Sequence, residues 1–369
     1  MKIYIAFVIP LILWSCQKKN SIENRQYPFF VGTYTNTGTS QGIYRYLLDK
    51  DGGLKRIGLA SKIENPSFLA FSSNKKFLLA VSEINRDNTG TISSFLISGD
   101  SLLFMNQSSS GGADPCFVSV NNNGYVLVAN YTGGNVGLLR LNAKGELSPL
   151  LDVEKHIGFG TTEQQQSPHA HSVWFEPVDN KIISVDLGTN QLWFSRLDTA
   201  LNILVPSNTQ TLNLNLSAGP RHLVFHPNGK WIYVVNELDC TVTKVFRFED
   251  GKYEMGSSVS TLPEGYSEPN ACADIHISSN GEFLYASNRG HNSIAIFQVD
   301  ESNGDLKLIG HQPTNGDWPR NFSLSPDENY LLVANQNTNN IVSFKRDKTT
   351  GLLEYVSQVE APSPVCILF

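Results

Sequence analysis

The chain has 369 residues, of which 40% are hydrophobic and 17% are charged, and its formal net charge is −6. Such a length suggests either several domains or one repeat architecture. No segment carries the clustered Lys and Arg side chains that bind nucleic-acid phosphates, so we predict no nucleic-acid partner.

The first 20 residues differ from the rest of the chain. Lys2 precedes an apolar run, residues 3–14, which is too short to span a membrane and has the length of a signal-peptide core. The run ends in Leu13-Trp14-Ser15-Cys16, which resembles a bacterial lipobox with Cys16 as the acylated residue. The alternative is an ordinary signal peptide that contains a cysteine. Residues 1–20 are thus predicted to be a lipoprotein-type signal peptide and the start of a tether, and residues 21–28 a linker.

Lipidation at Cys16 would place the protein in the cell envelope, on a periplasmic or outer-membrane face, with the lipid anchor as its only membrane contact. Without a lipobox, the expected location is the cytoplasm. The other cysteines, Cys116, Cys240, Cys272 and Cys366, show no metal-ligand spacing and no disulfide framework, so we predict no metal, no cofactor and no disulfide. Cys116 and Cys366 lie in apolar runs and are expected to be buried.

From residue 29 onward, short apolar runs that end in a small or polar residue recur, and their last residues lie 47 to 56 positions apart. The seven runs are Phe29–Thr33, Phe77–Ser82, Tyr125–Asn130, Lys181–Asp186, Trp231–Asn236, Phe283–Asn288 and Tyr330–Asn335. A partner run, typically opened by a proline, precedes six of them, and turn dipeptides such as Asn228-Gly229 join the two. A period near fifty residues holds about four short strands, which is one blade of a propeller.

The two ends of the chain complete the pattern. Ser363–Phe369 supplies only the first strand of a blade, and Phe29–Thr33 supplies only a second strand. Pairing them would leave no open sheet edge. We therefore predict an all-β fold over residues 29–369: a seven-bladed β-propeller closed by pairing of the N- and C-terminal strands. We expect a monomer.

Two repeat positions should meet at one mouth of the central channel, because antiparallel neighbours begin and end on the same face. The position that opens the first strand reads Ser67, Cys116, His171, Arg221, Ala273, Arg320 and Val365. The position just past the second strand reads Tyr34, Glu83, Tyr131, Leu187, Glu237, Arg289 and Gln336. The pattern therefore gathers arginines, a histidine and a carboxylate at one site.

This combination suits a small anionic ligand with a reactive acyl centre. Arginine forks bind carboxylate or phosphate and can stabilise an oxyanion. His171 or Glu237 could serve as general base. An alternative is that Arg221 and Glu237 only neutralise each other. The residues expected to contact the substrate are His169, Arg320, Tyr34 and Tyr131.

The remaining histidines carry weaker signals. His222, His226 and His276 lie within strands or at their turns and are expected to be structural, whereas His156, His291 and His311 have no partner in view.

The segment Gly219–Lys230, which reads GPRHLVFHPNGK, and the following Val235–Leu238 resemble the signature of the propeller-type lactonase family. Pro168–Val173, Ala273–His276, Ser287–Arg289, Trp318–Arg320 and Val31–Tyr34 are similar to the same family, so the resemblance runs from about Phe29 to the end. It implies a metal-independent lactone hydrolase of the 6-phosphogluconolactonase type, with His171, Arg221, Glu237 and Arg289 as the active-site set.

Export through a lipobox would separate the protein from cytoplasmic sugar phosphates, so the lactone outside could be a different one. The alternative functions are a non-catalytic propeller that binds an envelope glycan or a partner protein, and a carboxymuconate-type isomerase that forms lactones from unsaturated diacids.

Overall fold

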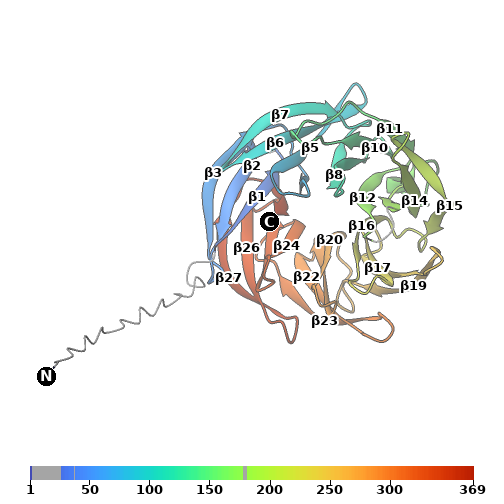
Figure 1. The fold of residues 1–369 in the computed structure, drawn as a ribbon. Helices are drawn as coiled ribbons and strands as arrows, with labels where there is room; N and C mark the ends of the chain where they lie inside the picture. Colours follow the sequence, from blue (N-terminus) through green and yellow to red (C-terminus); the bar gives the residue numbers. More distant parts are fainter. Residues whose placement is uncertain (2–25, 37, 178–180) are drawn as a thin grey trace.

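The computed structural model describes residues 1, 26–36, 38–177 and 181–369. In this part of the chain, seven four-stranded antiparallel sheets stand around a central axis (Figure 1). The predicted signal peptide, Cys16 and residues 21–25 of the linker lie outside the described residues. None of the described helices is long and apolar enough to cross a membrane.

Each blade runs from an innermost strand at the axis to an outermost strand at the rim. The innermost strands are β4 (Leu69–Phe71), β8 (Pro115–Val120), β12 (Ala170–Phe175), β16 (Pro220–Phe225), β20 (Ala271–Ile277), β24 (Pro319–Leu324) and β28 (Pro364–Leu368). The second strands are β5 (Phe77–Arg86), β9 (Tyr125–Asn130), β13 (Lys181–Asp186), β17 (Trp231–Asn236), β21 (Phe283–Arg289), β25 (Tyr330–Asn335) and β1 (Tyr27–Thr33).

The outer half of each blade is less buried. The third strands are β6 (Thr89–Ser98), β10 (Asn135–Arg140), β14 (Gln191–Asp198), β18 (Thr241–Arg247), β22 (Ser293–Val299), β26 (Asn340–Arg346) and β2 (Gly42–Leu48). The fourth strands are β7 (Ser101–Ser109), β11 (Asp152–Lys155), β15 (Ile203–Asn213), β19 (Tyr253–Ser260), β23 (Leu306–Pro313), β27 (Leu353–Glu360) and β3 (Leu54–Lys62). One short 3₁₀ helix, η1 (Glu163–Gln165), is described between β11 and β12.

The predicted fold and ring closure are confirmed. β1 pairs with β28 in an antiparallel register that sets Val31 opposite Ile367, so strands from both ends share one blade. At this junction Gly32 is required by a close approach, because a Cβ there would lie 2.3 Å from the carbonyl oxygen of Pro66 in the next blade. The apolar core lies between blades, where Phe29 and Tyr46 from one blade pack against Tyr330 and Leu332 from the neighbouring blade.

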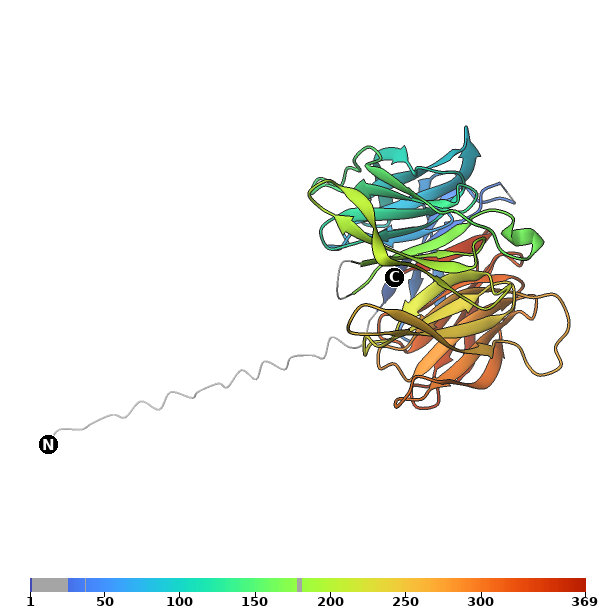
Figure 2. The ribbon, with the colours of Figure 1, turned by 90° about the vertical axis from the view of Figure 1, so that its right-hand side faces the viewer.

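The disk has two faces, seen edge-on in Figure 2. Innermost strands begin and second strands end on the face that also carries η1; we call this the site face. The opposite face, here the back face, carries the first residues of β1 and the C-terminal residue Phe369.

Candidate functional site

The first residues of the innermost strands converge on the axis, as the repeat predicts. A cavity of only about 10 Å³ there is lined by Ser67, Cys116, Arg221, Arg320 and Val365, together with Phe68, His222 and Asn321. The other two positions lie beside them: the carbonyl of Ala273 accepts a hydrogen bond from Arg221, and His171 Nδ1 lies 3.7 Å from Cys116 Sγ. The side chains at the axis therefore leave almost no open space, and we call them the axis floor. The residues on the site face next to this floor form what we call the channel mouth: Tyr34, Glu83, Tyr131, His169, His171, Arg221, Glu237, Arg289 and Arg320.

Two arginines form ion pairs with one carboxylate in the channel mouth. Glu237 Oε2 lies 3.0 Å from Arg221 Nε and 2.8 Å from Arg289 Nη2. Arg221 also donates to the Ala273 carbonyl, and Arg289 donates to the carbonyls of Ala271 (3.2 Å) and Cys272 (2.9 Å). Arg289 thus uses its Nε and Nη2 groups inside the protein and Arg221 uses its Nη1, while Arg221 Nε faces Glu237 as an ion pair without hydrogen-bond geometry. The mutual neutralisation of Arg221 and Glu237 is therefore real, and Arg289 adds a second cation to it.

The charges in this cluster shift one another's pKa values. Burial, followed by the neighbouring Arg289 and Arg320, lowers the pKa of Arg221 to about 10, so it still carries its charge at neutral pH. Burial disfavours the Glu237 carboxylate, but Arg289, Arg221 and Arg320 outweigh that effect and hold its pKa below the usual range. Glu237 is therefore ionised and a weak proton acceptor.

His171, in contrast to the ionised Glu237, is an uncharged group of the mouth. It is buried at the start of β12, with its ring 5.4 Å from the rings of both Tyr131 and His222. Burial, and then the positive charge of Arg221, lowers the pKa of His171 well below its usual value. No hydrogen bond to its Nε2 is found among the described residues, while its Nδ1 lies 3.7 Å from Cys116 Sγ. His171 is thus a neutral imidazole at pH 7 whose Nε2 has no partner in the described parts of the chain.

Tyr131 and His169 form the wall next to His171. Their rings stack with centroids 4.4 Å apart, and His169 Nδ1 lies 3.0 Å from the Tyr131 carbonyl oxygen. Burial, and then the nearby Glu237 carboxylate, raises the pKa of Tyr131 to about 12, so its hydroxyl stays protonated and can donate.

Arg320 is the arginine of the mouth whose guanidinium is not bonded to any other protein group that the structure describes. Its guanidinium lies 5.3 Å from the centre of the Tyr34 ring, and no hydrogen bond to it is found within the described ranges. Tyr34 in turn donates its hydroxyl to both oxygens of Glu83, each at 2.9 Å. Glu83 therefore belongs to the mouth, although the sequence analysis assigned it no role. It occupies the same repeat position as Glu237, and that signal could have found it.

A buried pair behind the mouth holds the His169 loop. His156 Nδ1 lies 2.6 Å from Asp186 Oδ2, and the other Asp186 oxygen accepts the backbone N–H groups of His169 (2.9 Å) and Thr189 (2.7 Å). His156, for which the sequence indicated no partner, therefore has one. His291 and His311 also have partners, Ser293 Oγ at 2.6 Å and the Thr261 carbonyl at 2.8 Å.

Behind the axis floor lies a polar network, whose residues also line the central hollow of the back face. Asp274 accepts from His222 Nδ1 (2.9 Å), from His276 Nε2 (3.1 Å) and from the amide of Asn321. Burial, and then the Arg221 charge, lowers the pKa of His222 to about 4, so its imidazole is neutral. This agrees with the predicted structural role of His222 and His276.

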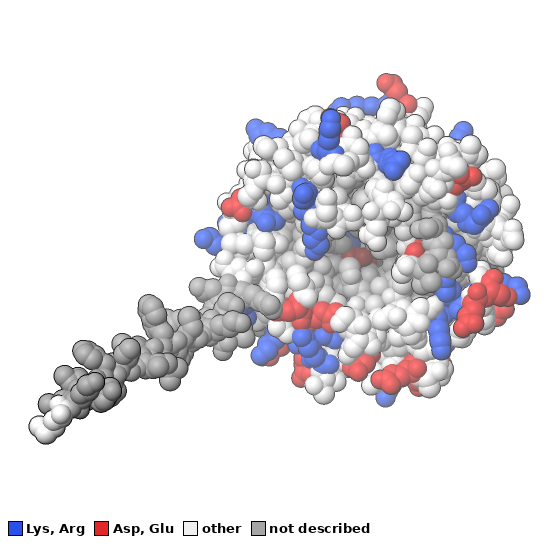
Figure 3. Space-filling view, in the orientation of Figure 1, with Lys and Arg blue, Asp and Glu red and all other residues white. Residues whose placement is uncertain are grey.

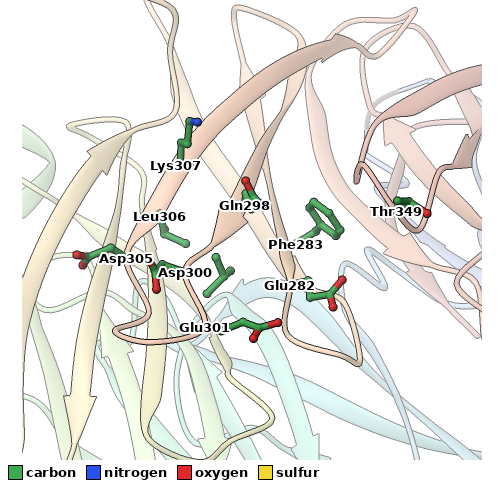
Figure 4. Close-up of a pocket in the computed structure, with 10 residues that line it drawn as sticks. Glu282, Phe283, Gln298, Asp300, Glu301, Asp305, Leu306, Lys307 and Thr349 are labelled. Carbon is green, nitrogen blue, oxygen red and sulfur yellow. The ribbon is translucent and has the colours of Figure 1, made fainter.

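The larger openings of the molecule lie elsewhere. A hollow of about 680 Å³ at the centre of the back face, visible in Figure 3, is lined mainly by apolar side chains such as Phe71, Phe117 and Trp174. Another pocket, of about 630 Å³, lies at the edge of blade β20–β23 (Figure 4). Its Asp305 is paired with Lys244, and Asp300 accepts from Ser302, so neither carboxylate is free.

The four cysteines of the described ranges are free and buried, which includes the two predicted to be so. Residues 26–36, 38–177 and 181–369 contain no group of three or more His, Cys, Asp or Glu side chains placed to hold a metal ion.

Comparison with known proteins gives a consistent result. Residues 28–369 match the family described as lactonase, 7-bladed beta-propeller. The chain is 36% identical over 350 residues to a 6-phosphogluconolactonase of Bacillus subtilis, covering 93% of this chain and 98% of that protein. It is similar in structure to a periplasmic gluconolactonase of Pseudomonas aeruginosa, with a TM-score of 0.89, 30% identity, and coverage of 93% of this chain and 98% of that one. A Lactobacillus plantarum protein gives a TM-score of 0.88 at 34% identity, with coverage of 94% and 99%.

Proposed function

The chain belongs to the seven-bladed β-propeller lactonases and is an esterase of the 6-phosphogluconolactonase type, and from this premise we propose that it opens a sugar-acid lactone with water at the channel mouth. The observation that carries the proposal is the placement of a neutral imidazole, His171, and a guanidinium without a hydrogen-bond partner in the described ranges, Arg320, as the second residues of the innermost strands β12 and β24. Hydrolysis of an ester needs both a proton acceptor and an oxyanion stabiliser.

We propose His171 as the general base. It removes a proton from a water molecule, whose oxygen attacks the lactone carbonyl carbon. The charge that develops on the carbonyl oxygen is stabilised by Arg320, with Arg221 adding positive charge nearby. When the ring C–O bond breaks, the departing ring oxygen takes the proton from His171, and the product is the open hydroxy acid.

The other mouth residues hold the substrate and the charge balance. Tyr131, Tyr34 and His169 present hydroxyl and imidazole groups that can bond the hydroxyls of a sugar ring. Glu237, held between Arg221 and Arg289, fixes both guanidinium groups and is a poor base because its pKa is lowered. In this scheme a protein side chain stabilises each charge that develops during the reaction, so we propose that the reaction requires no metal ion.

The test is ring opening by the full-length protein in a pH-stat, measured against a panel of phosphorylated and unphosphorylated lactones. We expect a rate well above spontaneous hydrolysis that EDTA does not change, and a drop of about 10²-fold for both Arg221→Ala and Glu237→Gln. Turnover that both substitutions leave unchanged would place the reaction elsewhere. Absence of turnover on every lactone, with binding of a glycan or a protein instead, would replace the enzyme by a binding module.

We further propose that the protein is lipid-anchored through Cys16 in the cell envelope, which the Leu13–Cys16 motif supports. The first residues of β1 lie on the back face, opposite the site face. Cys16→Ser is expected to move the protein from the membrane fraction to the soluble fraction. An unchanged membrane fraction would contradict lipidation at this residue.

A further inference from the structure

The charge balance of the channel mouth selects among possible lactones. Three guanidinium groups, Arg221, Arg289 and Arg320, face two carboxylates, Glu237 and Glu83. The histidines of the axis add no charge, because His171 and His222 have lowered pKa values. Among these five side chains one positive charge is therefore in surplus, which equals the single negative charge of the transition state for opening an uncharged lactone.

The surplus positive charge is not positioned to bind a second negative group of the substrate in addition to the oxyanion. Arg221 and Arg289 are ion-paired with Glu237 and bonded to backbone carbonyls, whereas Arg320 has neither an ion pair within 4 Å nor a hydrogen bond in the described ranges. Glu83 lies beside Arg320: both contact Tyr34, and the two groups interact electrostatically. A phosphate monoester carries roughly −1.5 to −2 at pH 7. It would compete with the oxyanion for Arg320 and would meet the Glu83 carboxylate at the same place.

The charges on the loops around the mouth likewise disfavour a second negative group on the substrate. Acidic residues on the site face include Asp114, Asp239, Glu264, Glu268 and Asp317. Within the described ranges, the basic residues outside the mouth on this face are Lys62, Arg86 and Lys155, and Arg86 is already paired with Glu64 at 2.6 Å. A mouth that selected a dianion would be expected to carry the opposite field, because like charge slows the approach of a substrate.

We propose that the substrate is a sugar lactone without a phosphate group, and that Glu83 determines this specificity by accepting hydrogen bonds from sugar hydroxyls and repelling a substrate anion. The proposal rests on the proposed lactone hydrolysis. It differs from the anionic lactone expected from the sequence, because the sequence did not show that Arg221 and Arg289 are both ion-paired with Glu237 and bonded to backbone carbonyls.

The test compares kcat/KM of the full-length protein for δ-gluconolactone and for 6-phospho-δ-gluconolactone under identical buffer and salt. We expect the unphosphorylated lactone to be preferred at least about tenfold, since two adjacent like charges oppose the phosphorylated one. Glu83→Gln keeps an acceptor for the Tyr34 hydroxyl but removes the charge, and it should reduce this preference about fivefold. The matched control, Glu64→Gln, removes an acid of the same face outside the mouth and should leave the ratio within about twofold.

A wild-type preference for the phosphorylated lactone would overturn this inference and leave the hydrolase proposal standing. Equal changes of the ratio in Glu83→Gln and Glu64→Gln would overturn the role of Glu83. No turnover of either lactone would overturn the proposed function, and this inference with it. The wild-type ratio decides the substrate class even if a variant fails to fold.

Discussion

His171→Asn is expected to lower kcat/KM for lactone hydrolysis by about 10³-fold, because it removes the proposed general base. The same assignment fixes the pH dependence. Since burial and Arg221 hold the pKa of His171 well below its ordinary value, the basic form persists into mildly acidic solution. The wild-type kcat/KM should stay flat from about pH 8 down to about pH 6 and fall only as the pH approaches that lowered pKa.

The control is His311→Asn, which removes an imidazole that donates to a backbone carbonyl in an outer strand, far from the reacting groups. It should retain wild-type kcat/KM. If His171→Asn kept more than about a tenth of the activity while Glu237→Gln lost it, Glu237 would be the base and the present assignment would be wrong.

Arg320→Ala is expected to lower kcat/KM by about 10²- to 10³-fold, the cost typical of losing one oxyanion donor. The physical reason is that Arg320 has no hydrogen-bond partner in the described parts of the chain and so meets the developing charge without breaking an internal bond. Arg320→Lys should recover part of the activity, since it restores the charge without the planar fork. Initial rates over a range of lactone concentrations give kcat and KM separately.

Arg56→Ala is the matched control, because Arg56 also lies over a tyrosine ring, 4.7 Å from the centre of Tyr44, but in outer strand β3. It should leave kcat/KM unchanged. Equal losses in Arg56→Ala and Arg320→Ala would show that the effect arises from lost packing, and Arg320 would then have no part in the chemistry.

The sequence predicted the inner half of each blade much better than the outer half. Second strands such as Tyr125–Asn130 and Trp231–Asn236 are buried on both sides, so they are continuous apolar runs with abrupt ends. Fourth strands such as Leu54–Lys62 and Tyr253–Ser260 lie half-exposed at the rim, and their mixed composition resembles a loop. Their existence follows from the period of the repeat, but their bounds do not.

The site could be predicted wherever topology alone places a residue. The propeller brings the first positions of its innermost strands together, so Arg221 and Arg320 were found by counting along the repeat. Contacts between blades could not be found in this way. That Tyr34 bonds Glu83 of the next blade, and that Asp186 holds both His156 and the His169 loop, depends on side-chain directions that one sequence does not reveal.

A crystal structure of the protein with the product-like sugar acid gluconate would test the central claim most directly. The account predicts the gluconate carboxylate at the channel mouth, hydrogen-bonded to the Arg320 guanidinium and next to His171 Nε2, with hydroxyls toward Glu83 and Tyr34. Gluconate bound in the apolar hollow of the back face, with the mouth unchanged, would contradict it.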